Sequence, residues 1–191
     1  MNLIQNIKNI LGNYYLKHKM KSLHRNKAFI NLEQAKTIGI VFDATEEENL
    51  ELVKKYIAYL REMKKKVKAI GYFDQKQIPS FVYSKLEYDF FCSSELNWYN
   101  VPSVVYVENF LNDEFDILID LNLDDCFPLR YISSLSKAKF KVGGKSEQNS
   151  SIFDLMIEID LSKGIKYFLR TIDTYLFIIN KKHDKQIIEN E

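Results

Sequence analysis

Apolar and polar positions along the chain follow a pattern that predicts alternating strands and helices. Residues 36–43 form a short apolar run that ends in an acid, which indicates a buried strand, and residues 65–74 form a second. Between them, a helix is predicted from apolar residues spaced by three and four positions: Leu50, Val53, Ile57 and Leu60. A strand, a helix and a strand in this order imply a parallel pair joined by a right-handed crossover.

The second half of the chain repeats this alternation. Residues 115–123 are apolar on both faces, as central strands of a parallel sheet are. Further strands are predicted at 88–91, 140–144 and 152–160, helices at 127–138 and 165–179, and a short helix or turn at 103–113. The expected fold class is α/β, a Rossmann-like three-layer sandwich with a mostly parallel sheet, in which 38–42 and 117–121 are buried strands.

A basic amphipathic N-terminal helix is expected before this domain. Within residues 2–25, the apolar stripe through Leu3, Ile7, Ile10 and Tyr14 should be buried against the body, a partner or a lipid surface. The expected organisation is a helical arm (1–35), a single α/β domain (36–180) and a polar tail (181–191).

Composition narrows the class of protein. Hydrophobic residues make up 46% of the chain and glycine and proline are scarce, which favours a globular domain with a real core. We find no signal peptide and no apolar run of the roughly 18–20 residues that a membrane span needs. Two cysteines without paired spacing argue against a disulfide scaffold or a cysteine zinc site, so a cytoplasmic location is expected.

Charge is distributed unevenly. Residues 1–36 carry a net charge of +6, whereas residues 37–162 carry −7. A basic arm on an acidic body suggests an anionic partner for the arm, although the arm could instead pack on its own body. The candidate anion-binding residues are Lys8, Lys17, Lys19, Lys21, Arg25 and Lys27, together with Tyr14 and Tyr15, which could stack on bases.

Two functions of different class follow from these features. The first is a non-catalytic binding or adaptor module whose arm contacts RNA in a ribonucleoprotein such as the ribosome, without reading DNA sequence. The arm could instead lie on an anionic membrane surface or bind a protein. The second is an enzyme or sugar-nucleotide binder that uses the carboxyl ends of the strands, where Asp43, Thr45, Asp74 and Asp120 are predicted to lie.

Several kinds of chemistry find little support in the sequence. The turn at 42–49 has no glycine and carries three glutamates, which would repel a phosphate group. Thr45 and Glu48 instead predict a capping box for the helix that follows.

Histidine is absent between residues 25 and 182, so histidine-dependent catalysis or zinc binding in the body is not expected. Three strand-end carboxylates could hold a hard cation, or could simply cap loops and bond backbone amides; we expect no metal or cofactor.

Two resemblances add to this reading. The segment FDILIDLN, a helix and AKFKVGG, within 115–144, resembles the acceptor-side half of heptosyltransferase-type glycosyltransferases, which implies a half-enzyme without its donor domain. Over residues 1–180, the basic start, KTIGIVFDA at 36–44 and the same two strands resemble an uncharacterised protein family of Bacteroidota. This second resemblance implies a bacterial cytoplasmic protein and supplies no activity.

Overall fold

Six parallel strands form the centre of the molecule. The computed structural model describes residues 3–80, 82, 88–158 and 160–179, so the predicted tail at 181–191 lies outside the described residues. Within them the sheet has the order β3-β2-β1-β4-β5-β6, and every neighbouring pair is parallel. The strands are β1 (Thr37–Asp43), β2 (Lys66–Phe73), β3 (Tyr88–Cys92), β4 (Ile117–Asp120), β5 (Phe140–Gly144) and β6 (Leu155–Ile157). The predicted Rossmann-like α/β fold class is confirmed.

The two segments predicted to be central strands pair with each other. Ile38 of β1 lies opposite Ile117 of β4, and Val41 lies opposite Asp120. All four residues of β4 are buried, and β1 is buried except at its two ends. Both faces of these strands are covered by helices, which explains their continuous apolar runs.

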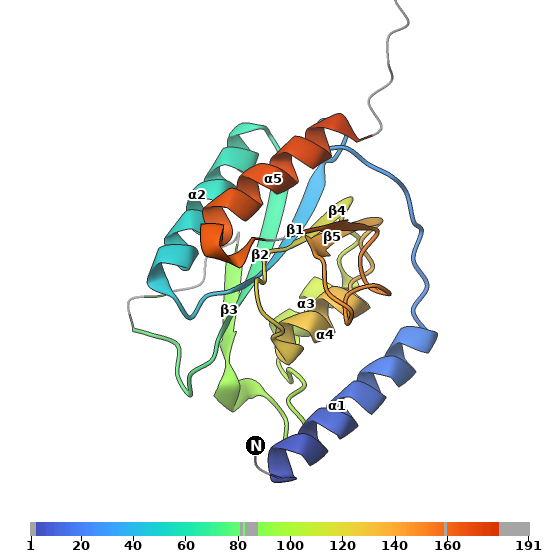
Figure 1. Ribbon diagram of the computed structural model, residues 1–191, viewed down its shortest axis with the longest axis vertical. Coiled ribbons are helices and arrows are strands. Elements are labelled where there is room, and N and C mark those ends of the chain that lie inside the picture. The colour runs from blue at the N-terminus through green and yellow to red at the C-terminus, as the bar shows by residue number, and fades with distance from the viewer. Residues whose placement is uncertain (1–2, 81, 83–87, 159, 180–191) are drawn as a thin grey trace, which may run out of the picture.

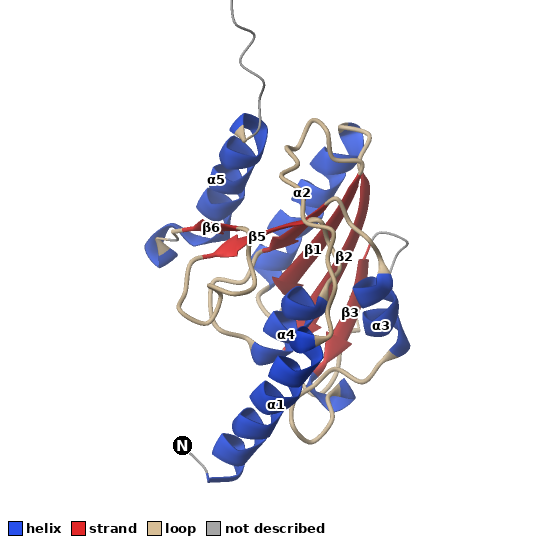
Figure 2. Ribbon diagram, turned by 90° about the vertical axis from the view of Figure 1, so that its right-hand side faces the viewer, coloured by secondary structure: helices blue, strands red, loops and turns tan. Residues whose placement is uncertain are grey.

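Helices cover both faces of the sheet (Figures 1 and 2). On one face α2 packs beside α5, and on the other α3 packs beside α4. The N-terminal helix α1 contacts α4, so it forms an outer addition to that layer (Figure 2). The helices are α1 (Leu3–Lys21), α2 (Glu47–Glu62), α3 (Val105–Asn112), α4 (Phe127–Leu135) and α5 (Gly164–Ile178), with short 3-10 turns at Ser93–Glu95 and Leu161–Lys163.

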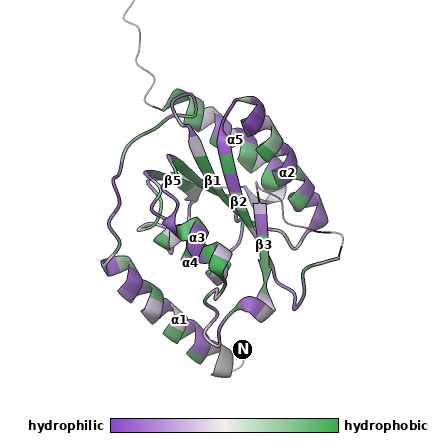
Figure 3. Cartoon of the chain, turned by 180° about the vertical axis from the view of Figure 1, so that it is seen from behind, coloured by the Kyte–Doolittle hydropathy of each residue, from purple (hydrophilic) through white to green (hydrophobic). Residues whose placement is uncertain are grey.

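The core has two halves, one on each face of the sheet. On the α2 and α5 side, Phe42 and Phe168 are almost fully buried, and on the α3 and α4 side Val41 and Leu129 are. The neighbours Val41 and Phe42 therefore point to opposite faces, as successive strand residues do. Figure 3 shows β1 as largely hydrophobic, whereas α1 alternates between hydrophilic and hydrophobic segments.

The start of α2 differs from the expected capping box. The helix begins at Glu47 after Glu46, and its first N–H groups receive no side-chain cap. The Asp43 carboxylate instead accepts a 2.8 Å hydrogen bond from the Thr45 amide, and the Thr45 hydroxyl accepts one of 3.0 Å from the Asp74 amide. Thr45 is thus used to tie the end of β1 to the end of β2, and the capping prediction is wrong.

Candidate functional site

The inner face of α1 belongs to the core. Leu16 is only 4% exposed and packs with the α3 and α4 half of the core. The Tyr15 ring stacks on Tyr131 with centroids 6.4 Å apart and meets the edge of Tyr99 at 5.5 Å. Helix α1 therefore supplies part of one layer, as in the alternative in which the arm packs on its own body. Tyr15 is therefore engaged within the protein.

The outer face of α1 carries three residues of the predicted apolar stripe. Ile7 is 45% exposed, Ile10 67% and Tyr14 72%. These three side chains do not pack against the body, so burial of the stripe against a partner or a lipid surface stays a prediction; the side chain of Leu3 lies outside the described residues. Gly12 explains which face turns inward, because its missing side chain lets the helix backbone approach the Tyr99 carbonyl closely.

Most cations of the arm face solvent. Lys17, Lys19 and Lys21 are exposed, and Lys8 is half-buried at the mouth of a groove. Lys19 also lies over the Tyr15 ring, 5.4 Å from its centroid. These lysines remain available to an anionic partner. Separately, among the described helices none is both long and apolar enough to cross a membrane.

Arg25 has a different role from the lysines. Its guanidinium donates to Asp154 at 2.6 Å and to the Ala138 carbonyl at 2.9 Å, and its side chain is 8% exposed. Lys27 reaches the same carboxylate at 3.2 Å from the solvent side. Arg25 thus fastens the segment after α1 to the body, and it is not placed to bind an external anion.

Three of the predicted strand-end residues come together. Asp43, Thr45 and Asp74 line a cavity of 270 Å³ at the carboxyl ends of β1 and β2. This point lies beside the β1–β4 boundary, where the strand order reverses and where open α/β sheets usually bind ligands. Asp120 does not line this cavity; it faces a separate one of 60 Å³ on the other side of its loop.

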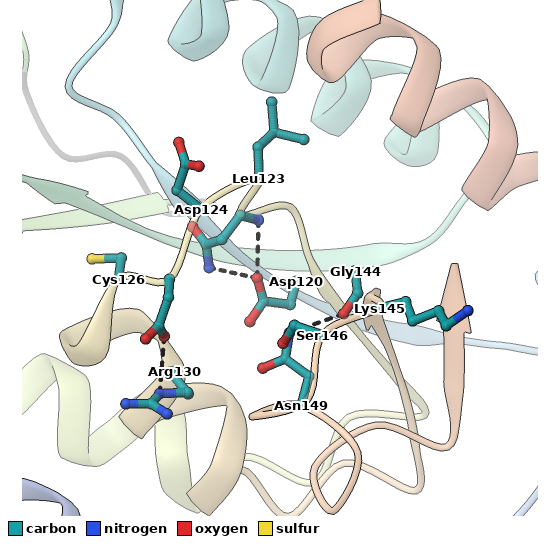
Figure 4. Close-up of a pocket in the computed structure, with 11 residues that line it drawn as sticks. Asp120, Leu123, Asp124, Cys126, Arg130, Gly144, Lys145, Ser146 and Asn149 are labelled. Carbon is teal, nitrogen blue, oxygen red and sulfur yellow. Dashed lines mark hydrogen bonds and ion pairs between the residues drawn. The ribbon is translucent and has the colours of Figure 1, made fainter. Parts of the chain in front are cut away.

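Asp120 is buried in a polar network (Figure 4). It is 5% exposed and accepts hydrogen bonds from the Ser133 hydroxyl at 2.6 Å and from the Asn122 amide at 3.0 Å. Burial raises its pKa to about 6, although these hydrogen bonds act in the opposite direction. Its contacts are those of a residue that orders the β4–α4 loop.

The loop between β4 and α4 is the meeting point of three cavities. Cys126 lines all three, which have volumes of 60, 270 and 580 Å³. Burial, assisted by nearby carboxylates, raises the pKa of the Cys126 thiol to about 12. The thiol is therefore protonated at neutral pH and is a poor nucleophile. Within the described residues, no group of three or more His, Cys, Asp or Glu side chains is arranged to hold a metal ion.

Two basic residues with contacts inside the fold were not predicted from the sequence. Arg130 of α4 donates to Asn13 of α1 at 3.1 Å and lies 3.1 Å from the Asp125 carboxylate. Lys141 of β5 is 1% exposed and donates to the carbonyls of Ser133 and Ser134 at the end of α4. A lysine within the otherwise apolar strand at 140–144 was the one available signal of a buried ionisable group.

Comparison with known proteins gives a family and no activity. Residues 8–179 match a family described as a family of unknown function (DUF6913). No curated protein and no solved structure matches the chain at a significant level. The resemblance of 115–144 to heptosyltransferases is accordingly not shown, whereas the expectation of an uncharacterised family is confirmed. Since the match spans most of the sequence, the chain belongs to the DUF6913 family.

Proposed function

We propose that this protein is a non-catalytic module that docks on an anionic membrane surface through the outward face of α1. The observation that carries the proposal is the stripe of Ile7, Ile10, Tyr14, Lys17 and Lys21, all exposed. Their spacings of three, four, three and four positions place them on one face of the helix. We call this face the α1 stripe.

The α1 stripe has the two properties that an interfacial helix needs. Its first half is apolar and aromatic, and its second half is cationic. Apolar side chains gain roughly 25 cal/mol for each Å² removed from water. Each lysine near an anionic bilayer surface adds about 1 kcal/mol. Together they favour a helix that lies in the plane of the headgroups and does not cross the bilayer.

The charge distribution supports the same orientation. The first acidic residue of the chain is Glu33, so no carboxylate within α1 repels an anionic surface. The body from 37 to 162 is net acidic and would be held away from such a surface. A location on the cytoplasmic face of a membrane is what this proposal implies.

Lipid is favoured over RNA for two reasons. Stacking and ionic contacts by Tyr15 and Arg25 were part of the RNA hypothesis, and both side chains are engaged inside the protein. The stripe instead presents Ile7 and Ile10, whose aliphatic side chains have no good partner on a sugar-phosphate backbone. Of the two tyrosines predicted to stack on bases, Tyr14 is the one that is exposed.

Vesicle co-sedimentation tests the proposal. The full chain is mixed with vesicles of phosphatidylcholine alone or with added phosphatidylglycerol, at low and high salt. We expect binding to the anionic vesicles only, weakened by salt. Ile7→Ser with Ile10→Ser should abolish binding, and Lys17→Gln with Lys21→Gln should weaken it about tenfold or more, given about 1 kcal/mol for each lysine.

Matched variants on another surface serve as controls. Ile178→Ser and Lys166→Gln change an exposed apolar residue and an exposed lysine of α5 and should leave vesicle binding unchanged. Binding to single-stranded RNA without binding to anionic vesicles would overturn the proposal. So would vesicle binding that the two stripe variants do not reduce.

A further inference from the structure

A ligand-sized groove lies between α1 and the carboxyl edge of the sheet. Its volume is 580 Å³, within the range of about 300–1,000 Å³ typical of small-molecule sites. One wall is the face of α1 that carries Asn9 and Asn13. The opposite wall comes from the end of β2 at Asp74 and from the start of α4 with Phe127 and Arg130.

Polar contacts hold these walls in place. The Arg130 guanidinium donates to the Asn13 side-chain oxygen at 3.1 Å, and the Asn13 amide donates to the Asn9 carbonyl at 2.7 Å. On the other side, the Tyr72 hydroxyl donates to the Asp74 carboxylate at 3.1 Å. The hydrogen-bonding groups that face the groove are therefore already ordered, which lowers the entropic cost of binding.

The charges around the groove cancel. Lys8 and Arg130 are positive, whereas Asp74 and Asp125 are negative, and the remaining polar side chains are neutral. Arg130 already lies 3.1 Å from Asp125, so its charge is partly neutralised within the protein. Without an excess of cations, the groove is poorly suited to a phosphate or a nucleotide.

We propose that this groove binds a neutral polyhydroxylated ligand, a sugar or a polyol. The side-chain amides of Asn9 and Asn13 can both donate to and accept from ring hydroxyls, and the Asp74 carboxylate can accept from them. The half-buried Phe127 ring offers an apolar surface for the C–H face of a sugar. Asn9 and Asn13 lie on a different face of α1 from the α1 stripe, so the site is independent of membrane docking.

Titration of the full chain with neutral sugars tests the site. The probes are glucose, galactose, mannose, N-acetylglucosamine and maltose, compared with inorganic phosphate and uridine diphosphate. Binding is followed by backbone amide shifts in a labelled sample. We expect at least one sugar to shift residues of the β2 end, the α4 start and the groove face of α1, and we expect neither phosphate nor the nucleotide to do so.

Two variants and one control make the test specific. Asn9→Trp should fill the groove, and Asp74→Ala should remove a carboxylate from its rim; each should weaken sugar binding about tenfold or more. Asn112→Ala, an exposed change on α3, should have no effect. The proposal is overturned if no probe sugar binds, if the groove variants bind as well as the unaltered chain, or if phosphate or the nucleotide binds there instead.

Discussion

Arg25 and Asp154, 129 positions apart in the chain, form an ion pair of 2.6 Å in which both side chains are largely shielded from solvent. Burial acts to raise the pKa of Asp154, but hydrogen bonds from Arg25, the Lys141 amide and Lys27 outweigh it and lower the pKa. This pair joins the segment that follows α1 to the loop between β5 and β6. The basic arm is therefore anchored at its C-terminal end as well as through Leu16.

Breaking this pair should destabilise the whole protein. Arg25→Ala leaves the Asp154 carboxylate partly buried without its main partner, which costs about 3–5 kcal/mol in comparable sites. Lys27→Ala is the matched control, because Lys27 contacts the same carboxylate but is 67% exposed, and it should cost less than about 1 kcal/mol. Urea unfolding measures both. Equal effects of the two substitutions would contradict the structural role of Arg25.

Gly12→Ala should loosen α1 from the body. A Cβ at this position would lie 2.6 Å from the Tyr99 carbonyl oxygen and 2.9 Å from the Phe127 ring. We expect the protein to lose stability even though alanine favours a helix by about 1 kcal/mol relative to glycine. Tyr14→Ala on the outer face should change stability little. Hydrogen exchange along α1 would show the difference in stability between the two variants. An unchanged or increased stability of Gly12→Ala would contradict the close packing.

Asp120 should make the protein less stable as pH rises from about 4 to 6. Its pKa is about 6 in the folded chain because of burial, against about 3.9 for an unfolded aspartate, so in this window the folded state binds more protons. Asp120→Asn should remove this slope and stabilise the protein at neutral pH by up to about 3 kcal/mol. Urea unfolding as a function of pH measures both the slope and the stability at neutral pH.

Asp116→Asn provides the opposite case. Burial acts to raise the pKa of Asp116, but hydrogen bonds from Lys139 and from the Lys36 and Thr37 amides outweigh it and lower the pKa. The stabilising contribution of Asp116 is present above the pKa of the unfolded state and is lost as pH falls through the lower pKa of the folded state. Asp116→Asn should therefore destabilise the protein at neutral pH. Parallel pH profiles for Asp120→Asn and the unaltered chain would refute the assignment for Asp120.

Lys141 should make stability increase between about pH 6 and 10. Burial, reinforced by the charge of Arg25 and opposed by Asp154, lowers its pKa to about 6, whereas an unfolded lysine titrates near 10.4. In this window the unfolded state binds more protons, so the folded state gains stability as pH rises. Lys141→Met should flatten the rise by more than about 1 kcal/mol, and Lys166→Met on the surface of α5 should not. A Lys141→Met profile that still rises like that of the unaltered chain would show that Lys141 is charged in the fold.

The sheet could be predicted because the burial of a strand is indicated by the residues of its own segment. Residues 38–42 and 117–119 carry no polar side chain at successive positions, and only a strand covered on both faces needs such a run. The acids near the ends of the predicted strands also indicated the carboxyl edge, where Asp43 after β1 and Asp74 after β2 line one cavity. Asp120 turned away into its own network because Ser133, 13 positions later on α4, supplies a donor that no local pattern reveals.

The α/β class, the central strands and a basic helix at the N-terminus could be predicted from residue patterns, since each of these depends on the spacing of residues within one segment. Which face of that helix is buried depends on the elements that pack against it. A periodic stripe identifies a helix but not its neighbour, and the close approach of Gly12 to Tyr99 and Phe127 turns Leu16 inward and leaves Ile10 in solvent. The Arg25 pair and the groove beside α1 likewise form from segments far apart in the chain, so their geometry exists only once the layers have packed.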